Sequence, residues 1–181
     1  PIVFDTDECA RPTSYEALAG MRPAFKKGGV TTAGNASIIS DGASAVVVMA
    51  KEKAEAMGCE IMASVGAQGG FSQDMKHVLT TPIGAVPRIL KKEGIGLDDV
   101  DLVEINEAFS GSTIAVMREL GIDHAKLNVN GGSVAMGHPI GASGCRILVT
   151  LLHEMKKRDV KTGLACLCLG GGEAVGLIVK R

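Results

Sequence analysis

The chain has 181 residues, 46% of them hydrophobic, and its 19 Lys and Arg against 20 Asp and Glu leave a formal net charge of −1. A chain of this length and composition can bury the core of one domain, or of one domain plus part of another, which excludes a disordered protein. Basic residues are not gathered with aromatics, and the longest apolar runs are too short to cross a bilayer, so nucleic-acid and membrane partners are both disfavoured.

The first 58 residues show weak patterning. Pro1–Gly29 predicts a loop-rich arm with at most a short helix over Ser14–Met21. The valine-rich run Ala43–Ala50 predicts a buried strand, and Lys51–Gly58 predicts a short helix closed by its C-terminal glycine.

From residue 59 onward, strand patterns alternate with helix patterns. The expected strands are Ile61–Val65, Asp101–Ile105, Leu127–Asn130, Gly163–Leu169 and Ala174–Val179, and the expected helices are Ile83–Glu93, Ala108–Leu120 and Ala142–Arg158. Pro82 suits the first turn of the first helix, and the last two strands are linked by glycines as in a hairpin. The alternation predicts an α/β fold with a mixed or parallel sheet covered by helices on both faces.

Three unusual polar residues follow, or end, expected strands. Asn106 follows Asp101–Ile105, His138 follows Leu127–Asn130 through a glycine loop, and Cys168 ends Gly163–Leu169. Because carboxyl ends of neighbouring parallel strands meet at one edge, we expect these groups to converge. An imidazole, a thiol and the backbone N–H groups of glycine loops together favour acyl transfer.

Structural roles compete with this interpretation. A cysteine in an apolar strand is often an inert core residue, which applies to Cys168 and more strongly to Cys166. His138 can be a structural loop histidine, and Asn106 can be a helix cap. The other histidines have no spacing to cysteines or carboxylates typical of zinc, so no metal is expected.

The five cysteines are odd in number and widely spread: Cys9, Cys59, Cys145, Cys166 and Cys168. With no secretory segment recognised at the start, this usage predicts a reducing, cytoplasmic location.

Several motifs, in this order, closely resemble the second half of the thiolases, the acetyl-CoA C-acyltransferases. They are NEAF at residues 106–109, NVNGGSVAMGHPIGASGCRI at 128–147 and CLGGG at 168–172, and RPAF at 22–25 and TTAGNAS at 31–37 resemble the segment that precedes them. The resemblance implies the thiolase fold, in which two similar α/β halves pack as αβαβα layers. Residues 1–58 would be the tail of the first half, and residues 59–181 the C-terminal domain.

The resemblance also implies catalytic roles. Cys168 would be the general acid/base, while the nucleophile is another cysteine, in a C-x-S-G motif that these residues lack. His138, with a water held by Asn106, would stabilise an enolate oxygen, and the N–H of Gly170 would help form a second oxyanion hole.

The substrate contacts follow from the same resemblance. They are Ser37 and Ala33 beside the pantetheine, Phe25 and Ala24 as apolar walls, Ala108 and Phe109 at the thioester end, Leu79 in the acyl pocket, and Arg11 near the CoA nucleotide. Leu79, Ser110 and Glu173 depart from the family's usual residues, which leaves the acyl-chain length open.

The implied activity is acyl transfer between CoA thioesters in fatty acid metabolism, by condensation with acetyl-CoA or thiolysis of 3-ketoacyl-CoA. No cofactor beyond the CoA of the substrates is expected, and the intact protein is expected to be a homo-oligomer, a dimer or tetramer. These 181 residues alone are expected to be inactive. The alternative is a non-catalytic fragment, or one half of a split assembly, that binds CoA or a partner chain.

Overall fold

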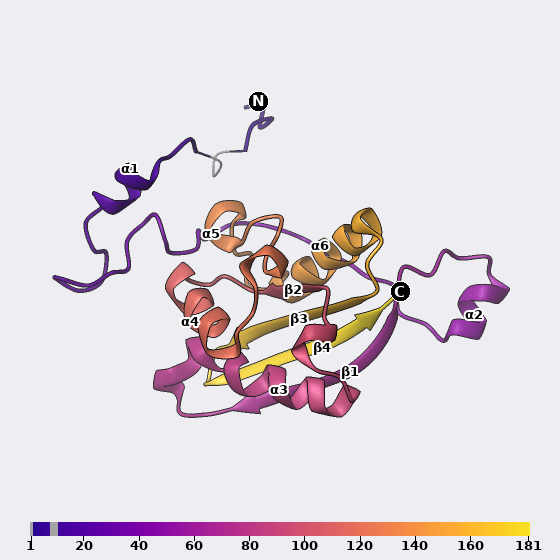
Figure 1. Cartoon of the computed structure of the whole chain (residues 1–181). Helices are drawn as coiled ribbons and strands as arrows, with labels where there is room; N and C mark the ends of the chain where they lie inside the picture. The colour runs from indigo at the N-terminus through magenta and orange to yellow at the C-terminus, as the bar shows by residue number, and fades with distance from the viewer. Residues whose placement is uncertain (1, 8–10) are drawn as a thin grey trace.

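The computed structural model describes residues 2–7 and 11–181, and it is built on a four-stranded mixed sheet (Figure 1). Its strands lie in the order β1-β4-β3-β2. β2 is parallel to β3, whereas β3 pairs with β4, and β4 with β1, in the antiparallel sense. The bounds are Ser64–Ser72 for β1, Leu102–Ile105 for β2, Thr162–Leu169 for β3 and Glu173–Lys180 for β4. The predicted glycine-linked hairpin is therefore confirmed as β3 and β4.

Helices cover both faces of this sheet, as predicted. In β3, Leu164 and Cys166 face a core shared with α3 (Pro82–Glu93) and α4 (Ser110–Leu120), while Ala165 and Leu167 face α6 (Ser143–Arg158). The period-2 alternation of a strand explains why one strand serves two cores. The short helices are α1 (Tyr15–Ala19), α2 (Lys51–Ala56), α5 (Ser133–Met136), η1 (Met75–Thr80), η2 (Leu97–Asp99) and η3 (His124–Lys126).

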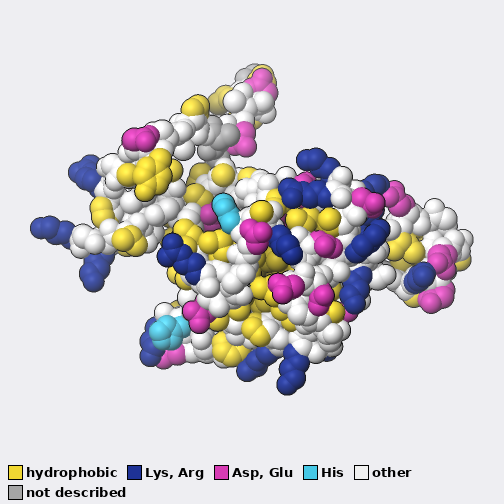
Figure 2. All heavy atoms as spheres, viewed as in Figure 1, with side chains coloured by type: hydrophobic (Ala, Val, Ile, Leu, Met, Phe, Trp, Pro, Cys, Tyr) yellow, Lys and Arg dark blue, Asp and Glu magenta, His cyan; other side chains and the backbone are white. Residues whose placement is uncertain are grey.

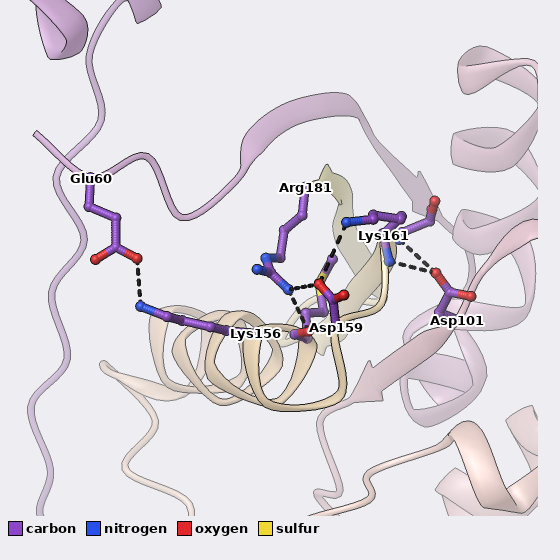
Figure 3. Close-up of polar contacts among 8 residues, drawn as sticks. Glu60, Asp101, Lys156, Asp159, Lys161 and Arg181 are labelled. Atoms are coloured by element: carbon purple, nitrogen blue, oxygen red, sulfur yellow. Dashed lines mark hydrogen bonds and ion pairs between the residues drawn. The ribbon is translucent and has the colours of Figure 1, made fainter.

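Polar contacts fix the end of the sheet opposite the polar strand ends (Figure 3). The carboxylate of Asp101 accepts hydrogen bonds from the backbone N–H groups of Lys161 and Thr162, at 2.9 and 2.8 Å, which joins the start of β2 to the start of β3. Arg181 donates to the Met155 carbonyl at 2.7 Å and ties the C-terminus to the last turn of α6. These contacts at the first residues of β2 and β3 fix the register of the parallel pair, and so fix which residues lie side by side at the carboxyl ends of the two strands.

Two predicted strands are wrong. Residues 43–50 form no strand, and the side chains of Val47 and Val48 are 84% and 74% exposed. A valine run becomes a strand only when another strand pairs with it, and no strand of the described residues lies beside this segment.

Leu127–Asn130 makes one parallel bridge, between Leu127 and Val103, and then turns. Asn128 has a φ of +48° there, and its side-chain amide exchanges two hydrogen bonds with the backbone of Ile105, at 2.9 and 2.8 Å. A side chain therefore replaces the backbone ladder that a further strand would have supplied. The strand expected over Ile61–Val65 is displaced to β1.

The first 58 residues lie largely outside the two cores. In Figure 1, α1 and α2 project from opposite sides of the sheet, joined by an extended segment. Figure 2 shows hydrophobic side chains spread across the middle of the same view, with Lys and Arg mostly at its margins. Among the described residues, no helix is both long and apolar enough to cross a membrane.

Candidate active site

The carboxyl ends of β2 and β3 bring Asn106 and Cys168 to the same edge of the sheet. The backbone N–H of Asn106 donates to the Cys166 carbonyl at 3.0 Å, so Asn106 extends the parallel pairing just beyond β2. Cys168 lies two residues further along β3 and on the same face as Cys166. Asn106 is only 4% exposed, while Cys168 is half-buried.

His138 reaches this edge from the glycine-rich loop between α5 and α6. Its backbone N–H donates to the Ile38 carbonyl at 2.9 Å, so the loop is held against the segment after residue 35. Its ring Nε2 lies 3.3 Å from Asn106 Nδ2, and its Nδ1 lies 2.6 Å from Ser143 Oγ. Two of the three predicted polar residues, Asn106 and His138, are thus in direct contact.

The contacts of Ser143 define what His138 can do. Ser143 Oγ also lies 3.0 Å from the Pro139 carbonyl, to which it donates its single hydrogen, so Nδ1–H donates to Ser143 and Nε2 accepts from Asn106. If the Ser143 hydroxyl instead turned its hydrogen to Nδ1, the ring hydrogen would lie on Nε2. Nε2–H and the Asn106 amide would then be two donors 3.3 Å apart, which could converge on one ligand oxygen.

Burial lowers the pKa of His138, and the charge of Arg146 lowers it further. The imidazole is therefore neutral at pH 7, with one hydrogen to place between its two nitrogens. A neutral ring with a movable hydrogen suits hydrogen-bond donation to an anionic oxygen better than it suits a permanent ion pair.

The amide of Asn106 is fixed on its other side by residues that the sequence analysis did not select. Ser133 donates to Asn106 Oδ1 at 2.8 Å, and Arg146 Nη2 lies 3.2 Å from Ser133 Oγ. Ser133 and Ser143 are both fully buried. The signal was present as two serines in the glycine- and alanine-rich sequence over residues 131–144, where a buried hydroxyl must find a partner.

The two cysteines of β3 differ in environment. Burial raises the pKa of Cys166 to about 12, with a smaller contribution from Cys168, so Cys166 is an inert core thiol. Cys168 is half-buried, and its burial also raises its pKa. Cys168 is therefore a neutral thiol at pH 7 that needs help to become a base. Cys9 lies outside the described residues, and the other four cysteines are free.

Gly170 lies exposed in the turn between β3 and β4. The turn is backed by the segment before α3, because Gln73 donates its N–H to the Gly172 carbonyl at 2.8 Å and Thr81 Oγ1 donates to the Glu173 carbonyl at 2.8 Å. Leu79, half-buried in η1, belongs to this same docked segment, and η1 packs against β3 and β4.

Half of the predicted substrate contacts gather where α4 begins. The N–H of Ser37 donates to the Ala108 carbonyl at 3.1 Å, and Ala36 forms an isolated bridge with Phe109. The rings of Phe25 and Phe109 meet edge to face, with centroids 6.2 Å apart. Residues 35–38 therefore run between the start of α4 and the His138 loop.

The remaining predicted contacts are more peripheral. Ala24 donates its N–H to the Thr31 carbonyl at 2.8 Å and is exposed, as is Ala33. Arg11 is exposed in the coil before α1, on the arm that Figure 1 shows away from the sheet. The structure thus does not bring Arg11 to the other predicted residues.

Two hollows lie near these residues. One, of about 410 Å³, opens beside α4 and is lined by Glu107, Thr113 and Met117 among others, but not by Asn106, His138 or Cys168. A second, of about 350 Å³, lies between residues 40–44 and 139–142, beside the His138 loop. Within the described ranges, no group of three or more His, Cys, Asp and Glu is placed to hold a metal ion.

Comparison with known proteins relates the chain to one family. The family model described as thiolase, N-terminal domain matches residues 2–52, and the one described as thiolase, C-terminal domain matches residues 59–181. An acetyl-CoA acetyltransferase of Pseudomonas aeruginosa is 52% identical over 182 aligned residues, and one of Syntrophomonas wolfei is 54% identical over 181. These alignments cover 100% and 99% of this chain but 46% of each relative, so the chain spans less than half of their length.

Solved structures agree with these sequence relatives. The acetyl-CoA acetyltransferase of Bacillus anthracis superposes with a TM-score of 0.95 at 44% identity, over 99% of this chain and 46% of that one. The human mitochondrial 3-ketoacyl-CoA thiolase, in a structure described as a complex with CoA, superposes with a TM-score of 0.90 at 38% identity, over 98% and 45% of the two chains.

Proposed function

The chain belongs to the thiolase family, and on that premise we propose that it forms part of an enzyme that transfers acyl groups between CoA thioesters. The reaction is Claisen condensation with acetyl-CoA or, in reverse, thiolysis of a 3-ketoacyl-CoA. The observation that carries the proposal is the contact of Asn106 with His138 at the sheet edge where β3 presents Cys168.

The proposed chemistry begins at Cys168. Its thiolate removes a hydrogen, as a proton, from the methyl carbon of acetyl-CoA, and the enolate carbon attacks an acyl group held on a second cysteine, which leaves as a thiolate. In thiolysis, Cys168 returns the proton to the same carbon. The second cysteine belongs to the C-x-S-G motif that these 181 residues do not contain.

The enolate oxygen is the group whose negative charge most needs stabilisation by the protein, because an α-hydrogen of a thioester is weakly acidic. Donors aimed at the place where negative charge develops lower the barrier most when they are preorganised and shielded from water. Asn106 is almost completely buried and His138 half-buried, and their nitrogens lie 3.3 Å apart. This pair supports stabilisation of the enolate oxygen, directly or through a water on Asn106.

The names of the relatives support CoA thioesters as the substrate class. Residues 35–38 contact Ala108 and Phe109, which supports a CoA arm along this segment. We place Ser37 and Ala33 beside that arm, Phe25 and Ala24 on its apolar walls, and Leu79 beside the acyl group. The homo-oligomeric state, the cytoplasmic location, the role in fatty acid metabolism and the need for no further cofactor stay predictions.

The test joins this chain to the part of the Pseudomonas aeruginosa acetyl-CoA acetyltransferase that it does not cover. We expect this hybrid to form and cleave acetoacetyl-CoA, and His138→Ala to lower the condensation rate by about 10²- to 10³-fold, as loss of an oxyanion donor does. His153→Ala, an exposed histidine of α6, is the matched control. A folded hybrid without turnover, or near-normal rates for His138→Ala, would contradict the proposal.

One observation favours the second candidate, a half of a split assembly. Large hydrophobic side chains of the first 58 residues are exposed, including Phe25, Ile39, Val47 and Val48. Exposed apolar surface of this kind is typical of an interface. Mixing this chain with the separately expressed first portion of the relative tests the candidate: a stable complex with turnover supports a split assembly, and the absence of a complex contradicts it.

A further inference from the structure

We propose that Arg146 is a positioning residue for the enolate-stabilising pair. From α6 it fixes the hydroxyl of Ser133, and through Ser133 it fixes the side-chain amide of Asn106, so that Asn106 directs its N–H toward His138. The inference rests on the proposed function for its catalytic consequence, although the orientation itself is a property of the fold.

Three contacts connect Arg146 to His138. Arg146 Nη2 lies 3.2 Å from Ser133 Oγ, Ser133 Oγ lies 2.8 Å from Asn106 Oδ1, and Asn106 Nδ2 lies 3.3 Å from His138 Nε2. The four residues come from different elements: α6, α5, the end of β2 and the loop before α6. Because Ser133 is fully buried, no water competes for its hydroxyl.

The direction of each hydrogen bond follows from the chemistry of Arg146. A guanidinium only donates, so Ser133 Oγ must accept from it, and the single hydrogen of the hydroxyl is free for Asn106. Only the carbonyl oxygen of the amide can accept that hydrogen. The NH₂ group of Asn106 is therefore turned to the other side, where it meets His138. Without Arg146, the Ser133 hydroxyl could accept from the amide instead, and Asn106 could rotate by half a turn.

Two nearby acids favour the charged form of Arg146. Glu104, in β2, is 3% exposed, and its charge and that of Glu107 both favour the charged guanidinium against the cost of its burial. Glu107 is itself occupied, since it accepts from Ser110 Oγ at 2.7 Å and from the Val134 N–H at 3.2 Å. Within the part of the chain that the structure describes, Nε and Nη1 of Arg146 have no hydrogen-bond partner. Among the described residues, the hydrogen bond to Ser133 Oγ is thus the one that the Arg146 side chain donates.

The experiment is a double-mutant cycle in the hybrid enzyme, with Arg146→Met, Ser133→Ala and the double variant. We expect each single variant to lower kcat for acetoacetyl-CoA synthesis by about 10- to 100-fold, as misorientation of a catalytic group does, with KM for acetyl-CoA nearly unchanged. Because Arg146 acts through Ser133, the double variant should be no slower than the slower single variant. Arg158→Met, in the same helix but paired with Glu154 near its end, is the control.

A second readout does not depend on turnover. Nitrogen NMR of the His138 ring, in the same hybrid, reports which ring nitrogen carries the hydrogen. We expect Arg146→Met and Ser133→Ala to shift that distribution in the same direction, and Arg158→Met to leave it unchanged. If the unmutated hybrid is inactive, the proposed function fails, whereas the NMR comparison still decides the orientation.

Three results would overturn the inference. They are an Arg146→Met effect that Ser133→Ala does not reproduce, additive losses in the double variant, and an unchanged His138 signal in both single variants. Should Arg146→Met fail to fold, Ser133→Ala alone decides, since normal turnover with an unchanged His138 signal in that variant contradicts the inference.

Discussion

At the scale of single residues, Cys168 poses the main chemical problem of the site. Its base form is the thiolate, yet burial raises its pKa above the ordinary value of 9.0, so little thiolate is present at pH 7. His138 cannot supply a permanent positive charge to stabilise that thiolate, because its own pKa is lowered by burial. Under the proposed function, this environment suits a proton that moves to carbon and back better than it suits a thiolate stored on Cys168.

The pH dependence of proton removal follows from this environment. In the hybrid enzyme, we expect the exchange of acetyl-CoA methyl hydrogens for deuterium to rise by close to tenfold from pH 7 to pH 8 and to rise further at pH 9, because the thiolate fraction rises below a raised pKa. His138 adds no step above pH 6.5, since its pKa lies below that value. Mass spectrometry measures the exchange, and Cys168→Ala is the control without a base. A plateau already reached at pH 7.5 would show that the thiol is activated in some other way.

At the scale of elements, the packing of α6 on β2 includes a buried acid. Burial raises the pKa of Glu104 to about 7, with Arg146 opposing and Glu154 adding to the shift. Between pH 4.5 and 7 the folded state therefore binds more protons than the unfolded state, so this group makes stability fall as the pH rises through that window. Above pH 7 the cost of the buried charge is fully present.

Glu104→Gln removes this cost. The difference in the free energy of unfolding between the variant and the parent protein should be about 3 kcal/mol more favourable to the variant at pH 8 than at pH 4.5. Each unit of pKa shift corresponds to about 1.4 kcal/mol. Denaturant unfolding at the two pH values measures the difference. Glu60→Gln is a control of opposite sign, because the Lys156 contact lowers the pKa of Glu60 and stabilises the fold at high pH. An equal stability difference at both pH values would contradict the assignment.

The turn between β3 and β4 offers a second test at this scale. Gly171 and Gly172 have φ values of +96° and +92°, but a methyl group on Gly172 would lie 2.3 Å from the Gln73 carbonyl oxygen, whereas one on Gly171 would meet nothing within 4 Å. Both alanine variants carry the cost of an unfavourable φ, about 1–3 kcal/mol. Only Gly172→Ala also pushes the turn away from the segment that bears Leu79.

We therefore expect Gly172→Ala to lose about 1–3 kcal/mol more than Gly171→Ala in the free energy of unfolding, as overpacking typically costs. Chemical denaturation of the two variants measures the difference directly. Equal losses would mean that the turn is not pressed against the η1 segment, and that Leu79 is placed by something else.

The sequence predicted the elements whose signals are local. Pro82 begins α3, Gly94 ends it in a left-handed conformation with a φ of +77°, and the glycines link β3 to β4. The α/β thiolase fold is confirmed by the structural relatives. The prediction of a strand over Ala43–Ala50 was wrong because a strand needs a second strand to pair with, and the described residues provide none beside this segment.

The candidate site divides in the same way. Asn106, His138 and Cys168 could be selected because their residue types and their places after strands are visible in the sequence. The roles of Ser133, Ser143 and Arg146 could not be predicted, although the two serines are visible in the sequence, because these roles arise from contacts between α5, α6 and the end of β2. Such contacts have no periodicity to detect and appear only when the elements are placed in space.

At the scale of the whole molecule, the described chain combines two closely packed hydrophobic cores with a set of large hydrophobic side chains that are exposed to solvent. The core residues on both faces of the sheet are almost fully buried, whereas Phe25, Ile39, Val47 and Val48 are largely exposed. The chain spans 46% of its relatives, and the exposed residues all belong to the segment matched by the N-terminal family model. We therefore propose that the part of the relatives that this chain does not span covers this surface.

From this we expect the 181-residue chain alone to show no acetoacetyl-CoA thiolysis, because the nucleophilic cysteine is missing, and to bind the fluorescent dye ANS through its exposed apolar segment. Joining the first portion of the Pseudomonas aeruginosa relative should restore turnover and lower dye binding together, since one event supplies the nucleophile and covers the surface. Val47→Ser with Val48→Ser separates the two effects: in the chain alone it should lower dye binding without creating activity. Clear thiolysis by the purified 181-residue chain would show instead that Cys168, or another of its cysteines, serves as nucleophile.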